Sequence, residues 1–480
     1  MKPSTYIIMI VLVTGISSCK KDFIELNPIS TVSVDVLFKT DKDFQDAVTA
    51  SYSAVMVPYQ NLWIFGDLRA DDSRHEIPSN VLLYSTDNFT LSSENIILSD
   101  TWLSYYKVIN RTSTILSKIA AADTSIVKNK ALYKAQAEFL RALAYFDLVR
   151  IFGDVPMITT PTSVEEAYKQ GREKTDRIYS EVIIKDLLDA ENNLPQKYAA
   201  ADVGKATKGA AKALLGRVYL TIHDFPKAEA KLMEVTTLGY SLLPNYNDLF
   251  DYTKNEHHSE YIFDIEYEEG IGLGSTFTNT FFPNSTEMAA YYKVNGSRTG
   301  SNSPTEGLFA AFVSQDLRKD VTVGVKGGFI NGSGTFIPFI ASISQSYTKK
   351  YITPVLTNND SKVNWKVIRY ADVLLMYAEA LNENGKTDQA LVYLNQVRAR
   401  AGLAGYTNLT KDDAREKIYL ERRLELSFEG HRWFDLLRTG RAYSTMKSFG
   451  MQPYMTVFPI PLSQIQIMNN PTIFPQNTGY

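Results

Sequence analysis

Apolar residues recur at three- and four-residue spacing over two long blocks, and this periodicity constrains the fold more than any other feature of the sequence. The first block covers residues 41–238 and the second covers residues 365–441. Such spacing places apolar side chains on one face of a helix, so each helix must bury that face against another. The pattern predicts amphipathic helices at residues 41–57, 100–122, 128–152, 174–193, 205–222, 369–384, 387–401, 411–428 and 431–439.

Two segments repeat one helical design. Residues 205–239 carry Gly216 and Ala228, and residues 372–401 carry Ala378 and Ala390; the second small residue follows the first by twelve positions in both cases. Small residues at these positions let paired helices approach closely, as in tetratricopeptide repeats. We therefore predict a mainly α fold, a tetratricopeptide-like superhelix of helical hairpins. Residues 100–152 offer a third hairpin, although its linker lacks an Asn/Gly turn signal.

Irregular sequence interrupts the helical blocks in two places, at residues 61–99 and 241–364. The longer stretch is rich in glycine and has short β-branched or aromatic runs at 261–265 and 336–343, which predict a few short strands. Ordering a long irregular segment costs conformational entropy, so such segments are uncommon unless they are functional. We expect the two stretches to pack together on the helical scaffold.

The N-terminus predicts a signal peptide. Lys2 precedes an apolar run over residues 6–16, which is followed by Ser17, Ser18 and Cys19. The run is shorter than the roughly 20 residues needed to cross a bilayer, and no later segment is long and apolar enough to do so. Cys19 is the only cysteine in 480 residues, which excludes an intramolecular disulfide. We predict cleavage after residue 18, lipidation of Cys19, and one domain over residues 19–480, with a scaffold at about 40–240 and 365–441 and an insertion at about 241–364.

The charge balance argues against nucleic acid as a partner. The chain has 50 basic and 53 acidic side chains and a formal net charge of −3, without a basic stripe. The chain is rich in aromatic residues, with 29 Tyr and 24 Phe.

A conspicuous charged cluster lies in the second block. Its members are Glu421, Arg422, Arg423, Glu425 and Glu429, with His431, Arg432 and Asp435. Glu421 and Glu425 are one turn apart and share a helix face. Apolar residues are interleaved with these charges, as in an amphipathic helix whose charged side chains pair with neighbouring helices. We predict a structural role for this cluster.

Signals for catalysis or metal binding are poor. His257 and His258 are adjacent and cannot bind one ion from a common helix face, and His75 near Asp71, Asp72 and Glu76 lacks an established ligand spacing. No nucleophile-elbow motif is present, and a single sequence can neither show nor forbid a glycosidase pair of carboxylates. We expect a protein without cofactor or metal that is not an enzyme.

Sugar binding without catalysis needs aromatic faces and planar polar groups, and the irregular stretches hold both. Ordinary loop packing is the alternative for each residue. The candidate ligand-binding residues are Trp63, Asp67, Arg69, Asp72 and Tyr84 in the first stretch, and Tyr291, Tyr292 and Asn295 in the second.

Several long motifs in fixed order resemble the SusD/RagB family. They are residues 138–146 (EFLRALAYF), 152–156 (FGDVP), 369–382 (RYADVLLMYAEALN), 394–402 (LNQVRARAG), 421–436 (ERRLELSFEGHRWFDL), 458–461 (FPIP) and 476–480 (QNTGY). With Cys19 they span essentially the whole chain, and long ordered motifs are far more specific than a short one. Thr478 departs from the pattern, because the family commonly has proline there.

The resemblance implies a tetratricopeptide-like superhelix, an outer-membrane location, and a lid-like role over a SusC-like TonB-dependent transporter, usually in glycan uptake. Some relatives capture peptides instead. Ligand contacts in the family come from variable loops, so the motifs transfer no site residue. A surface glycoside hydrolase and a protein-assembly scaffold remain as alternatives from other classes.

Overall fold

The computed structural model describes residues 38–199, 202–340 and 346–480. The predicted signal peptide, residues 1–18, and Cys19 lie outside these residues. Within them, no helix is both long and apolar enough to cross a membrane.

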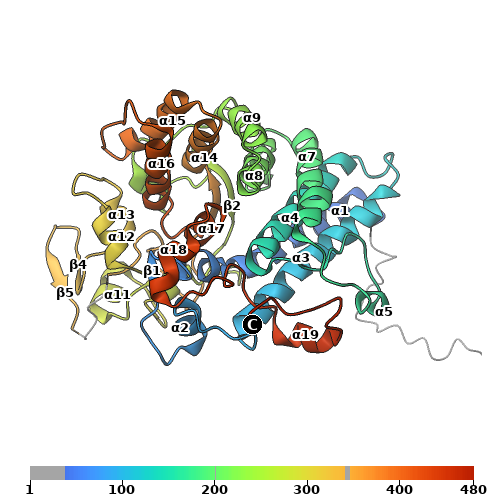
Figure 1. Ribbon diagram of the computed structural model, residues 1–480, viewed down its shortest axis with the longest axis horizontal. Helices are drawn as coiled ribbons and strands as arrows, with labels where there is room; N and C mark the ends of the chain where they lie inside the picture. Colours follow the sequence, from blue (N-terminus) through green and yellow to red (C-terminus); the bar gives the residue numbers. More distant parts are fainter. Residues whose placement is uncertain (1–37, 200–201, 341–345) are drawn as a thin grey trace, which may run out of the picture.

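Successive helices pack side by side to form the scaffold, which follows an arc in Figure 1. This mainly α architecture confirms the predicted fold class, and the helix ends agree with the predicted ones to within a few residues. The scaffold helices are α1 (Asp41–Tyr59), α3 (Ile96–Ala120), α4 (Lys130–Phe152), α7 (Ile184–Asn193), α8 (Lys208–Thr221), α9 (Phe225–Thr236), α14 (Tyr370–Glu383), α15 (Thr387–Arg400) and α16 (Lys411–Glu425).

The predicted helical hairpins are present as the pairs α8–α9 and α14–α15, and α3–α4 forms the third. A Cβ added at Gly216 would lie 2.7 Å from the side chain of Leu232 on α9. Glycine at this position therefore lets α8 and α9 approach closely. Ala378 and Ala390, the corresponding small residues of α14 and α15, are fully buried.

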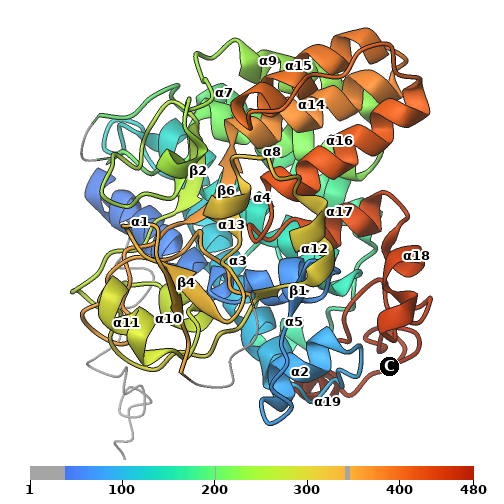
Figure 2. The ribbon, with the colours of Figure 1, turned by 90° about the vertical axis from the view of Figure 1, so that its left-hand side faces the viewer.

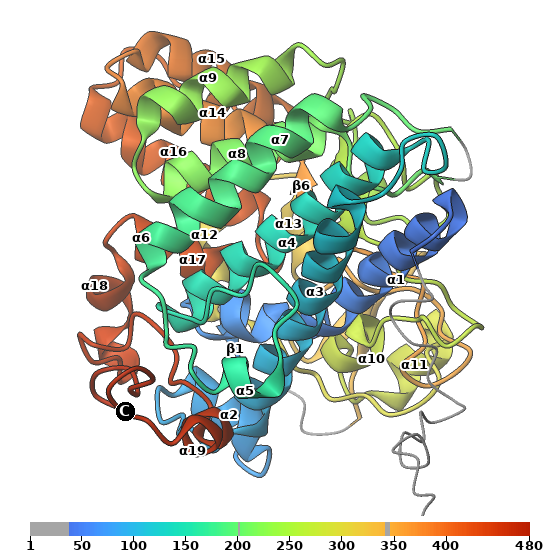
Figure 3. The same ribbon diagram turned by 90° about the vertical axis from the view of Figure 1, so that its right-hand side faces the viewer.

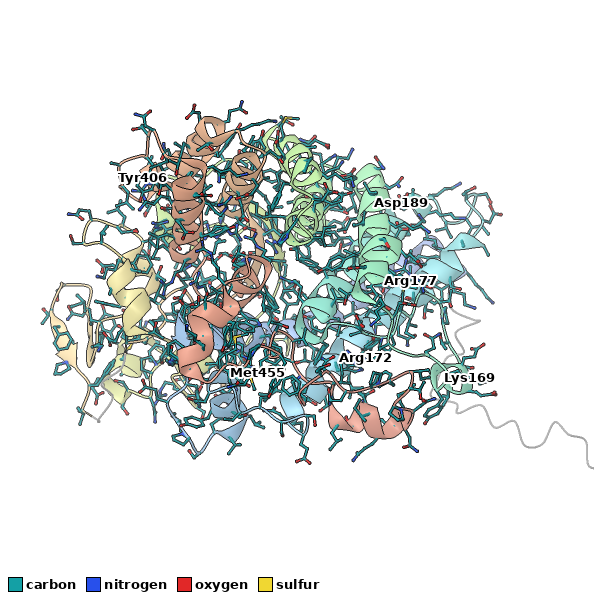
Figure 4. The ribbon with its side chains drawn as sticks, in the orientation of Figure 1. Lys169, Arg172, Arg177, Asp189, Tyr406 and Met455 are labelled. Carbon is teal, nitrogen blue, oxygen red and sulfur yellow. The ribbon has the colours of Figure 1, made fainter. Side chains whose placement is uncertain are left out.

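The segment predicted as one helix at 174–193 is divided. It begins as α6 (Thr175–Ile178), widens into a π-helical turn at Tyr179–Ile183, and continues as α7. A π turn inserts one extra residue into a helix, which apolar spacing alone does not reveal. Figure 4 labels Arg177 in α6 and Asp189 in α7.

The two irregular stretches pack together, as expected. Ser73 in β1 pairs with Pro304 in β3, the backbone N–H of Thr305 donates to the carbonyl of Asp72, and Ser73 Oγ donates to Asn302 Oδ1 at 2.6 Å. Figure 2 shows β1, α12 and β4 on one side of the molecule. The elements of these stretches are a π turn at Ile64–Leu68, β1 (Ser73–Arg74), α2 (Val81–Asp87), η5 (Tyr246–Leu249), β2 (Tyr261–Ile265), α10 (Phe277–Phe281), α11 (Thr286–Tyr292), β3 (Ser303–Pro304), α12 (Glu306–Ala311), α13 (Lys319–Thr322), β4 (Gly328–Ile330) and β5 (Phe336–Pro338).

Each sheet in the described residues is a two-stranded antiparallel pair: β1–β3, β4–β5, and β2 with β6 (Trp365–Arg369). The strand predicted at 261–265 coincides with β2, whereas only 336–338 of the run predicted at 336–343 is described as strand. A small apolar core of its own, which includes Phe282, Met288 and Phe329, supports the part of the insertion around α11 and the β4–β5 hairpin.

The C-terminal segment packs against the end of α4 through Arg172, which Figure 4 labels. The side chain of Arg172 donates to the carbonyls of Asp154 and Pro475, each at 2.7 Å. Figure 3 shows the lower elements of the molecule, α5 (Val164–Ala167), α18 (Ala442–Met446) and α19 (Leu462–Met468). α17 (Arg432–Arg438) precedes α18, and a 3₁₀ turn at Lys447–Phe449 follows it.

The charged cluster of the second block forms a buried ion-pair network, which confirms its predicted structural role. Glu425 accepts hydrogen bonds from Arg318, Arg369 and Arg400, and Glu429 pairs with Arg369 and Lys350. Burial alone would raise the pKa of Glu429, but Arg369 and Lys350 outweigh it and lower this pKa to about 2. Removing one partner from such a network would leave an uncompensated buried charge.

Candidate ligand-binding site

A surface cleft of about 560 Å³ lies where the two irregular stretches meet. Its lining comes from the β1–β3 pair and the start of α12, and from α16, α18 and the turn after α18. Figure 2 labels β1, α12, α16 and α18. The lining residues are Asp71, Arg74, Glu76, Ser303, Pro304, Thr305, Glu306, Gly307, Lys326, Ser346, Arg423, Thr445 and Phe449.

An arginine–aromatic pair forms part of the cleft wall. The guanidinium carbon of Arg74 lies 4.0 Å from the ring centroid of Phe449, and Arg74 Nη1 donates to Asp87 Oδ1 at 2.7 Å. The carboxylate of Asp87 thus holds the guanidinium plane beside the ring. A planar donor next to an aromatic ring is the combination that recognises a ligand with both hydroxyl groups and an apolar face.

Two carboxylates next to β1 are held by arginines, and one of them, Asp71, lines the cleft. Asp71 accepts from Arg432 Nε at 2.7 Å and Nη2 at 2.9 Å, and Asp72 accepts from Arg423 Nε at 2.7 Å. Burial opposes ionisation of Asp71, but Arg432 and Arg423 outweigh it and lower its pKa. Burial and the neighbouring Asp71 raise the pKa of Asp72. These pairs fix β1 against α16 and α17.

The cleft rim carries an ion pair between Glu306 and Lys326, whose side chains are largely exposed. Exposed ion pairs are weak, because water competes with both partners. Both side chains can therefore turn towards a ligand at low cost.

The structure brings together three of the predicted site residues, Tyr291, Tyr292 and Asn295, on α11 and the residues after it. The ring of Tyr291 lies edge-on to Tyr292, with centroids 4.9 Å apart, and its hydroxyl accepts a hydrogen bond from the backbone N–H of Gly332. Tyr291 remains 47% exposed. Asn295 is exposed and donates to the carbonyl of Leu356 at 3.2 Å.

A further aromatic face belongs to the β4–β5 hairpin. Phe336 pairs with Ile330 across the two strands, and both are more than 40% exposed. A Cβ added at Gly328 would lie 2.4 Å from the Phe336 ring, so the ring lies directly over this glycine. Phe336 is not among the predicted site residues, although it begins the β-branched or aromatic run at residues 336–343.

Four predicted site residues are buried and serve the fold instead. Trp63, Asp67, Arg69 and Asp72 are each 1–3% exposed. Trp63 packs edge-on against Phe281, Asp67 accepts from the backbone N–H of Gly430, and Arg69 lies 3.7 Å from the ring of Phe89. The reason is the π turn at Ile64–Leu68, which is buried throughout, so this part of the stretch is core and not surface loop.

Tyr84, the remaining predicted site residue, lies on α2. It is half-buried and does not line the cleft. The cleft residues missed by sequence reasoning are Arg74, Glu306, Lys326 and Phe449. They come from four distant parts of the chain, and no local pattern links them.

Metal binding finds no support in the described residues, where no three His, Cys, Asp or Glu side chains gather in a way that could hold an ion. His75 is 2% exposed, and its Nδ1 lies 3.4 Å from Ser301 Oγ. Burial lowers the pKa of His75, so its ring is neutral near pH 7.

A helical-repeat scaffold that carries a loop-rich insertion, with a surface cleft where insertion and scaffold meet, defines a class of α-helical binding scaffolds. The chain belongs to the SusD family, because the family model described as "SusD family" matches residues 239–480. A second model, described as "Starch-binding associating with outer membrane", matches residues 22–220.

Curated relatives and solved structures agree with this assignment. A SusD-like protein of Formosa agariphila is 28% identical, with full coverage of both chains. The starch-binding protein SusD of Bacteroides thetaiotaomicron is 24% identical over 72% of each chain. A solved structure described as a laminarin-binding SusD-like protein is 29% identical, has a TM-score of 0.78, and covers 92% of this chain and all of that one.

Proposed function

We propose that this protein is a surface-exposed carbohydrate-binding lipoprotein that captures oligosaccharides without cleaving them and delivers them to a SusC-like TonB-dependent transporter. The observation that carries the proposal is the cleft between the two irregular stretches, with the Arg74–Phe449 pair in its wall and the exposed Glu306–Lys326 ion pair at its rim. The similarity to a laminarin-binding SusD-like protein supports the ligand class.

Aromatic faces beyond the cleft supply further contacts in this proposal. Tyr291, Tyr292 and Asn295 gather at one end of the insertion, and Phe336 presents an exposed ring over Gly328. Sugar rings stack their C–H faces on such side chains, while amide and guanidinium groups bind pairs of hydroxyls.

Binding without bond cleavage is supported by relatives that are described as binding proteins, the starch-binding protein SusD of Bacteroides thetaiotaomicron and the laminarin-binding SusD-like protein. A glycosidase needs two carboxyl groups on either side of the scissile bond, one of them protonated. Asp71 does not suit the protonated role, because two arginines lower its pKa.

The proposal also covers how the protein is attached to the membrane and which transporter it serves. We assign residues 1–18 to a signal peptide, Cys19 to the lipid anchor, and residues 19–480 to a single unit that faces the cell exterior. The family description, with its association with the outer membrane, supports this location. The transporter would be the component that completes uptake, and co-purification from outer membranes checks that partner.

Calorimetric titration of residues 20–480 against polysaccharides, laminarihexaose and peptide digests tests the proposal, with reducing-end release followed in parallel. We expect saturable glycan binding without release, weakened when Phe449 is replaced by Ala. Release of reducing ends would refute the non-catalytic claim. Binding to peptides alone would move the assignment to peptide capture.

A further inference from the structure

A second concave site lies on another part of the molecule and shares no lining residue with the cleft. It is a pocket of about 410 Å³ between the α7–α8 connection, the end of α9 and the start of β2. Figure 2 shows β2 near the helical scaffold, above β1 and α12. Three half-buried tyrosines, Tyr198, Tyr240 and Tyr261, line this pocket with His257 and His258. We call it the tyrosine pocket.

The tyrosine rings are held in place by the scaffold. The Tyr198 hydroxyl accepts from Gln136 Nε2 at 2.9 Å and donates to the carbonyl of Ala206 at 3.0 Å. A Cβ added at Gly209 would lie 2.2 Å from the Tyr240 hydroxyl, so glycine at this position of α8 makes room for that phenol. Tyr261 lies edge-on to His257, with centroids 4.8 Å apart. The aromatic faces are therefore preorganised.

The charged groups of the tyrosine pocket are compensated within the protein. His257 Nε2 lies 3.0 Å from Glu266 Oε1, and Lys205 pairs with Asp202 at 2.5 Å. Burial and the nearby Lys366 and Arg369 lower the pKa of His258 to about 4, so that ring is neutral near pH 7. The remaining cation, Lys197, is exposed. Such a pocket suits a ligand without net charge.

His258 also provides a hydrogen-bond donor. Its Nδ1 accepts from the backbone N–H of Glu260 at 3.2 Å, which places the proton of the neutral ring on Nε2. The histidine is half-buried in the pocket wall, so this N–H can serve a ligand hydroxyl.

The tyrosine pocket is the first of three adjoining pockets, which we call the groove. It shares Val203, Gly204 and Lys205 with a neighbouring pocket of about 290 Å³, which in turn shares Met56 and Tyr267 with a third of about 480 Å³. The groove runs along α1 and β2, and it suits a chain of linked units more than one isolated ring.

We infer that the tyrosine pocket is a second carbohydrate-binding site, which takes one uncharged sugar unit of an oligosaccharide whose neighbouring units follow the groove. Aromatic side chains, the neutral His258 donor and the pairing of His257 and Lys205 with carboxylates together match a pyranose, which has an apolar face and hydroxyl edges. The inference rests on the proposed carbohydrate-binding function, and it adds a site with its own wall and its own residues.

Two variants disable the pocket in different ways. Ser259→Trp fills it from an exposed position, and Tyr240→Leu removes an aromatic face while keeping an apolar side chain. Matched controls are Ser314→Trp, at an exposed serine, and Tyr393→Leu, at a half-buried tyrosine of α15; neither lines the pocket or the cleft. Unfolding midpoints equal to that of the wild type would show that all four variants are folded.

Calorimetry and hydrogen–deuterium exchange of residues 20–480 with laminarihexaose and a panel of other neutral hexaoses test the inference. We expect a binding glycan to protect the backbone of residues 238–241 and 257–262 as well as the cleft. Both pocket variants should lose this protection and weaken pocket binding at least tenfold, while Phe449→Ala and the two controls retain it.

Protection confined to the cleft, with unchanged stoichiometry in both pocket variants, would overturn the inference and leave the proposed function intact. Absence of binding of every glycan to the wild type would instead remove the proposed function, and the second site with it.

Discussion

Replacement of Glu425 by Gln is the most direct test of the buried network behind the cleft. One carboxylate oxygen of Glu425 accepts from Arg369 and Arg400, and the other accepts from Arg318 Nη1 at 3.1 Å. Glu425 and Arg318 are fully buried, and Arg369 is 2% exposed. In the variant an amide NH₂ would face an arginine donor, and three guanidinium groups would lose their shared counter-charge.

The expected loss follows from this burial. Removing one partner of a buried ion pair lowers the free energy of unfolding by about 3–5 kcal/mol, because the charge that remains is desolvated and has lost that partner. We expect Glu425→Gln to lower the free energy of unfolding by that amount. The control is Glu416→Gln on the same helix, where an exposed glutamate pairs with Arg441 and should contribute about 0–1 kcal/mol.

Urea unfolding of both variants, with midpoint and slope compared to the wild type, provides the measurement. Burial raises the pKa of Glu425, but Arg400, Arg369 and Arg318 outweigh it and hold the pKa well below its usual value. The contribution of this carboxylate is therefore present above about pH 4.3 and is lost only as pH falls towards the folded pKa. An equal midpoint for Glu425→Gln and Glu416→Gln at pH 7 would refute the reasoning.

Three further predictions follow from single contacts. Phe336→Ala should weaken glycan binding by roughly 2- to 12-fold in calorimetry, the equivalent of about 0.5–1.5 kcal/mol for one aromatic contact, and unchanged affinity would exclude the ring from the site. Gly216→Val should lower the melting temperature, since overpacking costs about 1–3 kcal/mol, whereas Gly307→Ala, whose added Cβ has its nearest neighbour at 3.8 Å, should not. Burial raises the pKa of Asp67 to about 8 despite the Gly430 N–H, so the contribution of Asp67 to stability should fall as pH rises from about 4 to 8. Asp67→Asn removes this contribution, so the difference in stability between wild type and variant should change between pH 5 and pH 8 in urea unfolding, and parallel curves for both proteins would contradict it.

The placement of aromatic and polar side chains shows where sequence reasoning stops. Trp63 and Tyr291 both lie in irregular sequence with neighbouring polar residues, yet the first is 3% exposed and the second 47%. Exposure depends on what covers a side chain, and for Trp63 the covering residue is Phe281, more than two hundred positions away. The amino acids near Trp63 in the sequence do not indicate that contact.

The sequence by itself determined the helices, their pairing and the structural role of the charged cluster, because these depend on periodicity over one or two neighbouring elements. The small residues Gly216 and Ala378 predicted closely packed helix pairs, and the apolar residues around Glu425 indicated that the charged cluster is buried. The position and lining of the cleft were decided by the tertiary structure alone. Arg74 and Phe449, for example, are 375 positions apart in the sequence and come into contact only in the folded chain. A binding surface is built from side chains that the fold leaves uncovered, and that selection is made by long-range packing.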